Sequence, residues 1–247
     1  MIRITRLLRH PLKSHGREDI SDVELVAGQS MPWDRVWAVV HAASHADGSG
    51  WVSCVNFSRC AKAPELMAIE ARLDIATEAL TLRHPGLPEL TFHPDTDAAS
   101  FLDWVKPIVP QDRAQPERII RLDDRGFTDS DFASVTLCNM SSHRAVEQRL
   151  GHALSIHRWR GNIWFDGAAP WEEFDWIGKD LKIGEAILRP LERTDRCIAT
   201  TANPETGKRD ADTLGALETW GHQDFSVRAT VVKGGIVALE DTIEVLR

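Results

Sequence analysis

The side chain with the most reactive surroundings in this sequence is the thiol of Cys197. Arg193 and Arg196 precede it, and neighbouring cations favour the thiolate, which is the form that attacks electrophiles and binds metals. The turn-forming segment 203–207 (N-P-E-T-G) follows, so we expect the thiol to lie in or beside a loop. Local context therefore makes Cys197 a candidate for a chemical role.

The other cysteines have surroundings that favour structural roles. The chain contains four cysteines: Cys54, Cys60, Cys138 and Cys197. No two of them form a Cys-x2-Cys pair, which argues against a zinc ribbon and a thioredoxin-type site. Cys138 lies in an apolar strand pattern and is predicted to be buried and inert, whereas Cys54 and Cys60 lie in a mixed loop region. Without a recognisable secretory signal the compartment is predicted to be reducing, so we expect free thiols.

Other common catalytic signatures are missing from the sequence. None of the 10 histidines belongs to an H-E-x-x-H motif, and His41 and His45, four residues apart, lie in a predicted loop. The sequence also contains no G-x-S-x-G, G-x-G-x-x-G or P-loop motif. These absences argue against the common hydrolases, dinucleotide-dependent enzymes and NTPases.

The bulk composition is that of a globular protein without features of a nucleic-acid binder. Of 247 residues, 43% are hydrophobic and 27% charged, and the 29 basic against 37 acidic residues give a net charge of −8. No apolar run approaches the ~20 residues of a membrane helix. With no secretory signal recognised, the predicted location is cytoplasmic. The sequence offers no explanation for its 9 tryptophans and its lack of tyrosine.

The first half of the chain is predicted to form a β-rich lobe with one helix. Apolar runs and alternating patterns predict strands at residues 2–9, 35–41, 65–74 and 79–84. Asp97 can cap a helix that extends to Ile108. Residues 109–124, rich in Pro, Gln, Asp and Arg, are the predicted connection between two lobes.

The second half is predicted to form a barrel of short strands. The strands are expected at residues 133–138, 154–158, 162–166, 181–189, 226–232, 236–239 and 242–246. Two helices are expected, from Ser141 or Ser142 to Gly151 and from Asp212 or Thr213 to Gly221. The predicted fold is α+β, mainly β, with lobes at residues 1–115 and 116–247.

Five segments, in order along the chain, resemble the MOSC-domain family. Residues 196–207 (R-C-I-A-T-T-A-N-P-E-T-G) are similar to the signature R-C-x-x-T-T-x-[DN]-P-x-T-G, in the branch of the mitochondrial amidoxime-reducing component and its bacterial relatives. The other segments are 10–14 (like Y-P-x-K-S), 34–37 (D-R-x-W), 139–142 (N-x-S-S) and 158–162 (R-F-R-P-N). The resemblance implies a MOSC N-terminal β-rich lobe at 1–115 and a MOSC β-barrel at 116–247.

The resemblance also implies a molybdenum cofactor. In that family the cysteine of R-C binds molybdenum, which makes Cys197 the expected metal ligand. The other motif residues would surround the molybdopterin and its phosphate: Lys13, Ser14, Arg35, Asn139, Ser141, Ser142, Arg160, Asn162 and Arg196. Their chemistry suits this role, because Arg, Lys and a helix start attract phosphate and a soft thiolate suits a metal already bound by sulfur.

By resemblance, the expected function is reduction of N-hydroxylated compounds such as hydroxylamines, amidoximes or N-hydroxylated bases. Electrons would come from a separate ferredoxin-, flavin- or cytochrome-type protein, because the sequence has no cluster of four cysteines for an iron–sulfur centre. Two alternatives stay open, namely a sulfur carrier with a persulfide on Cys197 and a module that stores the cofactor. Asp129 and Asp166 are candidate proton donors without a specific signal.

Each motif also has a simpler interpretation. Lys13 and Ser14 could form an ordinary exposed loop, Arg35 a surface ion pair with Asp34, and Ser141 and Ser142 mere helix caps. Likewise, Arg158 and Arg160 could alternate on the solvated face of a strand. Three departures from the family pattern are His10 in place of an aromatic residue, Gly161 in place of proline, and the absence of a basic residue near Cys54 before Arg59.

Overall fold

The computed structural model describes residues 1–123 and 125–246. Its strands are β1 Arg3–Arg9, β2 Glu18–Ile20, β3 Asp22–Leu25, β4 Trp37–His41, β5 Glu70–Asp74, β6 Ala79–His84, β7 Leu87–Phe92, β8 Pro116–Arg121, β9 Val135–Asn139, β10 Ile163–Asp166, β11 Leu181–Ile183, β12 Ala186–Asp195, β13 Asp224–Lys233, β14 Gly235–Ala238 and β15 Ile243–Val245. The α-helices are α1 Ala98–Val105, α2 Met140–Leu150 and α3 Thr213–Glu218. Six short 3-10 helices are η1 Cys54–Asn56, η2 Pro64–Ala68, η3 Lys106–Ile108, η4 Ile156–Trp159, η5 Glu172–Trp176 and η6 Ile198–Thr201. The predicted α+β, mainly β class is confirmed.

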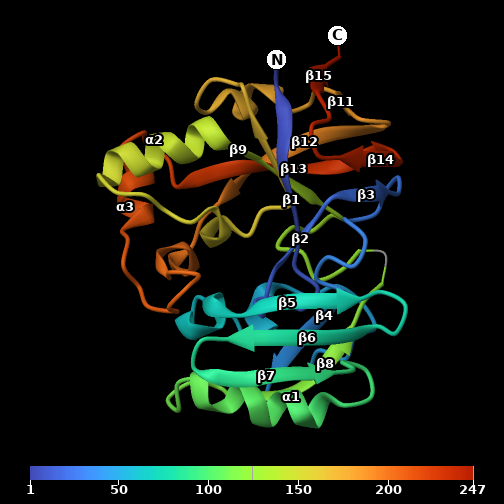
Figure 1. The fold of residues 1–247 in the computed structure, drawn as a ribbon, viewed down its shortest axis with the longest axis vertical. Coiled ribbons are helices and arrows are strands. Elements are labelled where there is room, and N and C mark those ends of the chain that lie inside the picture. Colours follow the sequence, from blue (N-terminus) through green and yellow to red (C-terminus); the bar gives the residue numbers. More distant parts are fainter. Residues whose placement is uncertain (124, 247) are drawn as a thin grey trace.

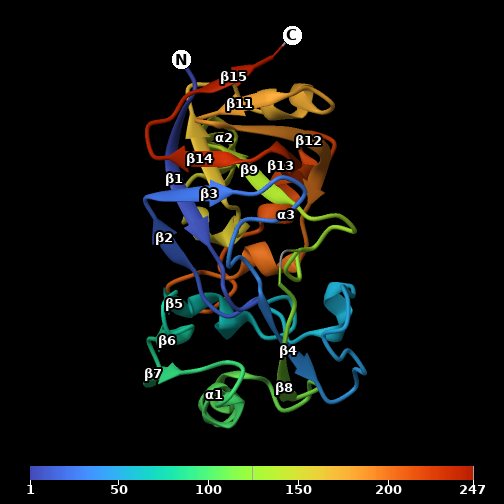
Figure 2. The same cartoon turned by 90° about the vertical axis from the view of Figure 1, so that its right-hand side faces the viewer.

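The strands divide between two lobes that are stacked along the long axis of the molecule (Figure 1). The barrel lobe contains a curled eight-stranded sheet in the order β15-β11-β12-β13-β9-β10-β1-β2, together with the pair β14-β3. Figure 2 shows β3 and β14 side by side on this lobe. The second lobe, hereafter the lower lobe, contains the pair β4-β8, the sheet β5-β6-β7 and helix α1.

The chain starts in the barrel lobe, crosses into the lower lobe and returns. Strand β1 is antiparallel to β10, with Leu7 opposite Ile163, so N-terminal strands complete a sheet made mostly by the second half. Strand β8, by contrast, pairs with β4 in the lower lobe. The two crossings place the loop after β1 and the loops of the second half at the junction of the lobes. The division at residues 115 and 116 stays a prediction.

Alternation of apolar and polar residues forms each core. In β13, Val227, Ala229 and Val231 are buried while Arg228 and Thr230 between them are half-buried, as expected for a strand with one face on a core. In the lower lobe, Asp97 caps α1 by accepting a hydrogen bond from Ser100 N, as predicted. That helix buries one side, including Phe101, against the sheet.

Several predicted elements differ from the structure. The predicted connection at 109–124 is wrong in part, because it contains β8, whose Ile120 is buried while Arg118 and Arg121 are only partly buried. Residues 154–158 form no strand: Ser155 caps the 3-10 helix η4 instead. The span 181–189 is two strands, since Gly184 takes a positive φ of 56° at the turn between them.

Helix α2 shows which side chain caps it. Asn139, rather than Ser141 or Ser142, is the N-cap, and its side chain accepts a hydrogen bond from Ser141 N. Gly151 ends the helix with φ of 77°, as predicted. None of the described helices is both long enough and apolar enough to cross a bilayer.

Candidate functional site

Cys197 lies at the lobe junction, between the end of β12 and the start of the 3-10 helix η6, and it is exposed. All four cysteines are free, and Cys138 is buried, which raises the pKa of its thiol to about 12. Among the described residues no group of three or more His, Cys, Asp and Glu side chains could hold a metal ion.

The buried Arg158 and the partly buried Arg196 hold the Cys197 loop in place. The Arg158 guanidinium donates to Thr201 O (3.0 Å) and pairs with Asp210. The Arg196 guanidinium donates to Phe225 O (2.7 Å) and to Trp159 O (2.8 Å), and burial lowers the pKa of Arg196 to about 10. Arg158 is 3% exposed, so its interpretation as part of a solvated face is wrong.

The loop also contacts the lower lobe. Arg209 donates to Ile198 O and, from the same guanidinium, to Ala61 O (3.0 Å). Arg17 donates to Pro204 O (3.3 Å) and to Ile69 O (3.1 Å). These two side chains fix the position of Cys197 relative to the lower lobe.

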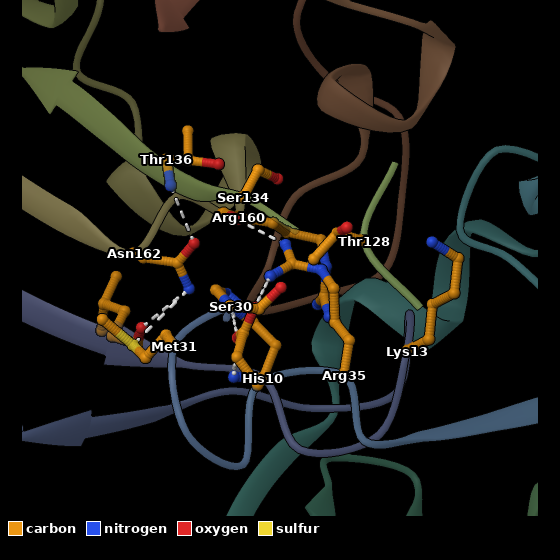
Figure 3. Close-up of polar contacts among 12 residues, drawn as sticks. His10, Lys13, Ser30, Met31, Arg35, Thr128, Ser134, Thr136, Arg160 and Asn162 are labelled. Carbon is orange, nitrogen blue, oxygen red and sulfur yellow. Dashed lines mark hydrogen bonds and ion pairs between the residues drawn. The ribbon is translucent and has the colours of Figure 1, made fainter. Parts of the chain in front are cut away.

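Beside this loop lies the arginine cluster, which we define as Lys13, Asp34, Arg35, Asp129 and Arg160. Arg35 has a positive φ of 57°, its Nη1 pairs with Asp34 and its Nη2 donates to Arg160 O (2.8 Å). Figure 3 shows Arg35 reaching Arg160, with Thr128 beside them. The Asp34–Arg35 pair is buried rather than superficial, because Asp34 is only 1% exposed.

His10, the residue that departs from the family pattern, supports Asp34 from the other side. Its backbone N donates to Asp34 Oδ1 (2.8 Å), and its Nδ1 lies 3.1 Å from the same oxygen. Burial, and then the charges of Arg160 and Arg35, lower the pKa of His10 to about 3, so the imidazole is neutral at pH 7. Burial opposes ionisation of Asp34, but the Arg35 charge and the interactions with His10 together outweigh it and lower the pKa of that carboxyl.

The guanidinium of Arg160 differs from the other charged groups of the cluster in its hydrogen bonding. Its backbone is left-handed, with φ of 50°, and its Nη2 donates to Gly16 O (3.2 Å). Its Nη1 is buried and has no hydrogen-bond partner among the described residues. Burial lowers the pKa of Arg160 to about 10, so it is a cation at pH 7. A buried cationic donor without a partner costs free energy unless an acceptor binds there.

Lys13 and Ser14 come from the loop after β1. Lys13 is 3% exposed, and its Nζ donates to Phe127 O (2.7 Å) and to Asp129. The surrounding protein opposes ionisation of Asp129, although its side chain is 54% exposed, but the Lys13 charge and hydrogen bond lower its pKa to about 2. Ser14 has φ of 64°, and its carbonyl oxygen accepts a hydrogen bond from Cys60 Sγ (3.2 Å). The exposed-loop interpretation of Lys13 is therefore wrong.

The predicted residues on α2 belong to a different group, the glutamate cluster of Asn139, Ser142 and Glu173, all of them 0% exposed. Glu173 accepts hydrogen bonds from Asn139 Nδ2 and Ser142 Oγ, both at 2.8 Å. Ser141 is half-buried, and its Oγ accepts a hydrogen bond from Arg144 (2.9 Å). Cofactor contact by the three predicted α2 residues stays a prediction.

Asn162 joins strands of the barrel lobe. Its Oδ1 accepts from Thr136 N (3.1 Å) and its Nδ2 donates to Leu8 O (3.3 Å), as Figure 3 shows in part. The structure thus gathers Lys13, Ser14, Arg35 and Arg160 at the junction and leaves Asn162 within the sheet. Cofactor binding by Asn162 and Arg196 stays a prediction.

Residues absent from the sequence-based site also contribute. Cys60, which is buried, lies against the Ser14 carbonyl, and Arg59 Nη1 lies 3.1 Å from Cys54 Sγ. A cation therefore does reach Cys54, although it comes from five residues downstream. His15 is buried near Arg160, and its Nδ1 lies 2.6 Å from Lys13 O. Position next to Lys13 and Arg35 was the only sequence signal for His15 and Asp34.

The junction suits an anionic group that also binds through sulfur. The arginine cluster has three cations against two carboxylates, and its unpartnered Arg160 donor points to an acceptor that is not part of the described chain. Arginine pairs well with phosphate oxygens. An exposed thiol on an anchored loop completes a donor set that fits a phosphorylated, metal-bearing cofactor.

Comparisons with known proteins agree with this description. Residues 1–107 match the model of the MOSC N-terminal beta barrel domain, and residues 124–244 match that of the MOSC domain. Mitochondrial amidoxime-reducing component 1 of Xenopus laevis is 27% identical over 120 residues, which span 48% of this chain and 34% of that protein. The match therefore covers about a third of the curated relative.

Among solved structures, the YUAD protein of Bacillus subtilis is 12% identical, covers 99% of this chain and 96% of its own, and has a TM-score of 0.48. YiiM of Escherichia coli is 13% identical, with 46% of this chain and 54% of that chain covered and a TM-score of 0.35. MOSC domains are associated with molybdenum cofactor binding. The two matched domains together span nearly the whole sequence, and the chain belongs to the MOSC-domain family.

Proposed function

We propose that this protein binds a molybdenum–molybdopterin cofactor and uses it to reduce N-hydroxylated compounds. The observation that carries the proposal is the placement of the exposed Cys197 thiol at the same junction as the buried, unpartnered donor of Arg160. The similarity to an amidoxime-reducing protein supports the choice of substrate class.

The chain's residues would hold the cofactor in two ways. Cys197 would supply the protein thiolate to the metal, and Arg35, Arg160 and Lys13 would attract the anionic part. Arg35 is already fixed by Asp34 and by Arg160 O, so little side-chain entropy is lost on binding. Contacts from Ser14, Asn139, Ser141, Ser142, Asn162 and Arg196 belong to the same proposal.

The chemistry is a two-electron reduction of an N–O bond. The cofactor, when bound, supplies the redox centre: the N-bound oxygen leaves as water, and the nitrogen gains a hydrogen, for two electrons and two protons consumed. The protein's part is to position the centre at Cys197 and to neutralise its charge. A separate ferredoxin-, flavin- or cytochrome-type protein would supply the electrons.

Metal analysis tests the proposal. The protein is expressed in a host that makes the pterin cofactor, beside Cys197→Ser and the control Cys54→Ser, which removes a partly buried thiol. We expect near-stoichiometric molybdenum in the wild type and in Cys54→Ser, and its loss in Cys197→Ser. Reduction of benzamidoxime by a chemically reduced sample then tests the substrate class.

Two other outcomes would replace the proposal. Absence of molybdenum together with cyanide-labile sulfur on Cys197 would indicate a sulfur carrier. Stoichiometric molybdenum without reduction of hydroxylamines, amidoximes or N-hydroxylated bases would indicate a storage module.

A further inference from the structure

A chain of aromatic rings connects the surface of the barrel lobe to the residue before Cys197. Trp159 stacks on Phe225 with 3.9 Å between ring centres and 11° between planes. Phe225 meets Trp171 edge to face at 6.3 Å, and Trp171 lies 5.1 Å from Trp220. Trp220 is 37% exposed, so the chain of rings ends at solvent.

The inner end of this chain is fixed to the Cys197 loop. The Arg196 guanidinium lies over both inner rings, 5.7 Å from the Trp159 centre and 5.6 Å from the Phe225 centre. It also donates to Trp159 O (2.8 Å). Because Cys197 directly follows Arg196, the path from the exposed Trp220 to the thiol runs through packed rings, one guanidinium and one peptide.

The surroundings of the outer end are acidic. Glu172 and Asp175 lie on η5 beside Phe174, Glu218 ends α3 two residues before Trp220, and Asp224 begins β13. Neither η5 nor residues 213–224 contain a Lys or Arg. Arg193 of β12 stacks 4.2 Å from the Phe174 ring centre and pairs with Asp224 at 3.8 Å. Helix α2, which packs against α3, adds Arg149 and Arg144, and Arg144 pairs with Asp166. The exposed indole therefore has an excess of negative charge around it.

We propose that the rings of Trp220, Trp171, Phe225 and Trp159 form the electron route between the Cys197 site and a redox protein that docks over Trp220. The proposal rests on the proposed function, which needs two electrons from outside the chain. Electronic coupling falls steeply across gaps, so rings in van der Waals contact couple two centres better than loosely packed aliphatic side chains. Indole is too hard to reduce for a biological donor, so the rings bridge the centres and are not themselves reduced.

The electron balance and the charge pattern define the partner. A one-electron donor is oxidised twice, in two successive encounters, for each N–O bond that is reduced. An acidic rim around an exposed aromatic residue favours a protein with a basic rim around its own redox centre, because complementary charge steers and orients the encounter.

The docking surface is tested first with cofactor-free protein. The probe is ferricytochrome c, a strongly basic haem protein, and binding is measured by titration calorimetry at low ionic strength. We expect Glu218→Lys to weaken binding about tenfold, whereas Glu244→Lys, the same charge change on exposed β15, leaves it unchanged. Equal weakening by both variants would overturn the docking surface, since it would reflect net charge alone.

The route is tested with molybdenum-loaded protein that has been reduced by dithionite. Its oxidation by ferricytochrome c is compared with oxidation by ferricyanide, which is small enough to approach Cys197 directly. We expect Trp220→Ala and the ring-removing Phe225→Leu to slow the cytochrome reaction at least tenfold and to leave the ferricyanide rate unchanged. Ile236→Ala, an exposed apolar residue on β14, is the control and should affect neither.

The outcomes separate the two proposals. A structural role for the rings would change both rates or neither, and either result would overturn the electron route while leaving the cofactor in place. Wild-type protein that holds no molybdenum would overturn the proposed function, and the electron route with it.

Discussion

The arginine cluster and the glutamate cluster both contain residues that the motifs assign to the cofactor, yet they differ in how well their polar groups are satisfied. In the glutamate cluster, Glu173 accepts hydrogen bonds from the side chains of Asn139 and Ser142. In the arginine cluster, Arg160 keeps a buried donor without a partner. A satisfied buried network stabilises the fold, whereas an unsatisfied cation is tolerated where a ligand completes it. The comparison teaches that the arginine cluster is the better candidate for ligand binding.

The largest expected effect comes from breaking the glutamate cluster. Glu173→Leu leaves the Asn139 and Ser142 donors without their acceptor, at about 1–3 kcal/mol for each buried group, so we expect the free energy of unfolding to fall by about 4 kcal/mol. Urea denaturation measures it. Glu172→Leu, at the neighbouring partly buried position, is the control and should cost under about 1 kcal/mol. Similar losses in the two variants would refute the importance of the cluster.

The arginine cluster should show the opposite behaviour. Arg160→Met removes a buried cation whose Nη1 lacks a partner, at the cost of one hydrogen bond to Gly16 O. We therefore expect a change of only about 1 kcal/mol in unfolding free energy but a loss of at least 100-fold in cofactor affinity, or about 2.7 kcal/mol. Molybdenum content and thermal denaturation together measure this. Arg158→Met is the matched control, because its loss of the Thr201 and Asp210 contacts should lower stability. A large stability loss in Arg160→Met would contradict the comparison.

Sequence reasoning identified Lys13, Arg35 and Arg160 of the arginine cluster and Asn139 and Ser142 of the glutamate cluster, but neither Glu173 nor the difference between the clusters. Lys13, Arg35, Arg160 and Cys197 came from local motifs, and these the fold brings to one junction. Glu173 lies more than thirty residues from Asn139, and no local pattern predicts that a carboxylate on the 3-10 helix η5 will accept hydrogen bonds from the start of α2. The pairing of β1 with β10 is likewise non-local, because strand partners depend on the whole topology.

Arg158 and Arg160 show why local patterns misled. Their alternation around Trp159 resembles a strand, but Ser155 caps a 3-10 helix there and Arg160 is left-handed. The sequence alone gives no reason for its many tryptophans, whereas the fold shows a packing role for one of them, Trp159, which stacks on Phe225.

The two clusters meet at a pair of small residues, which gives an intermediate prediction. Cys138 precedes Asn139, Gly161 follows Arg160, and a Cβ added at Gly161 would lie 2.1 Å from Cys138 Sγ. Gly161→Ala should therefore cost about 1–3 kcal/mol by overpacking. The double variant with Cys138→Ala should recover part of this, as measured by a double-mutant cycle of unfolding free energies. Simple additivity of the two changes would show that the contact is relieved elsewhere.

The smallest expected effect is a loss of stability with rising pH that comes from the glutamate cluster. Burial raises the pKa of Glu173 above its usual 4.5, although its hydrogen bonds with Asn139 and Ser142 oppose the shift. The folded protein thus holds this proton more tightly than the unfolded chain does. Glu173 consequently contributes stability that is present below pH 4.5 and is lost as the pH rises through its folded pKa.

Lowered pKa values at Asp34 and Asp129 act in the opposite direction at lower pH, so each variant's unfolding free energy must be compared with that of the wild type at the same pH. We expect Glu173→Gln to gain stability relative to the wild type as the pH rises from 4 to 8 in urea denaturation, whereas Asp129→Asn should lose stability relative to the wild type as the pH rises through the lower range. Parallel wild-type and Glu173→Gln curves would place this carboxyl's pKa at its unfolded value, and the glutamate cluster would then hold an ordinary ionised carboxylate.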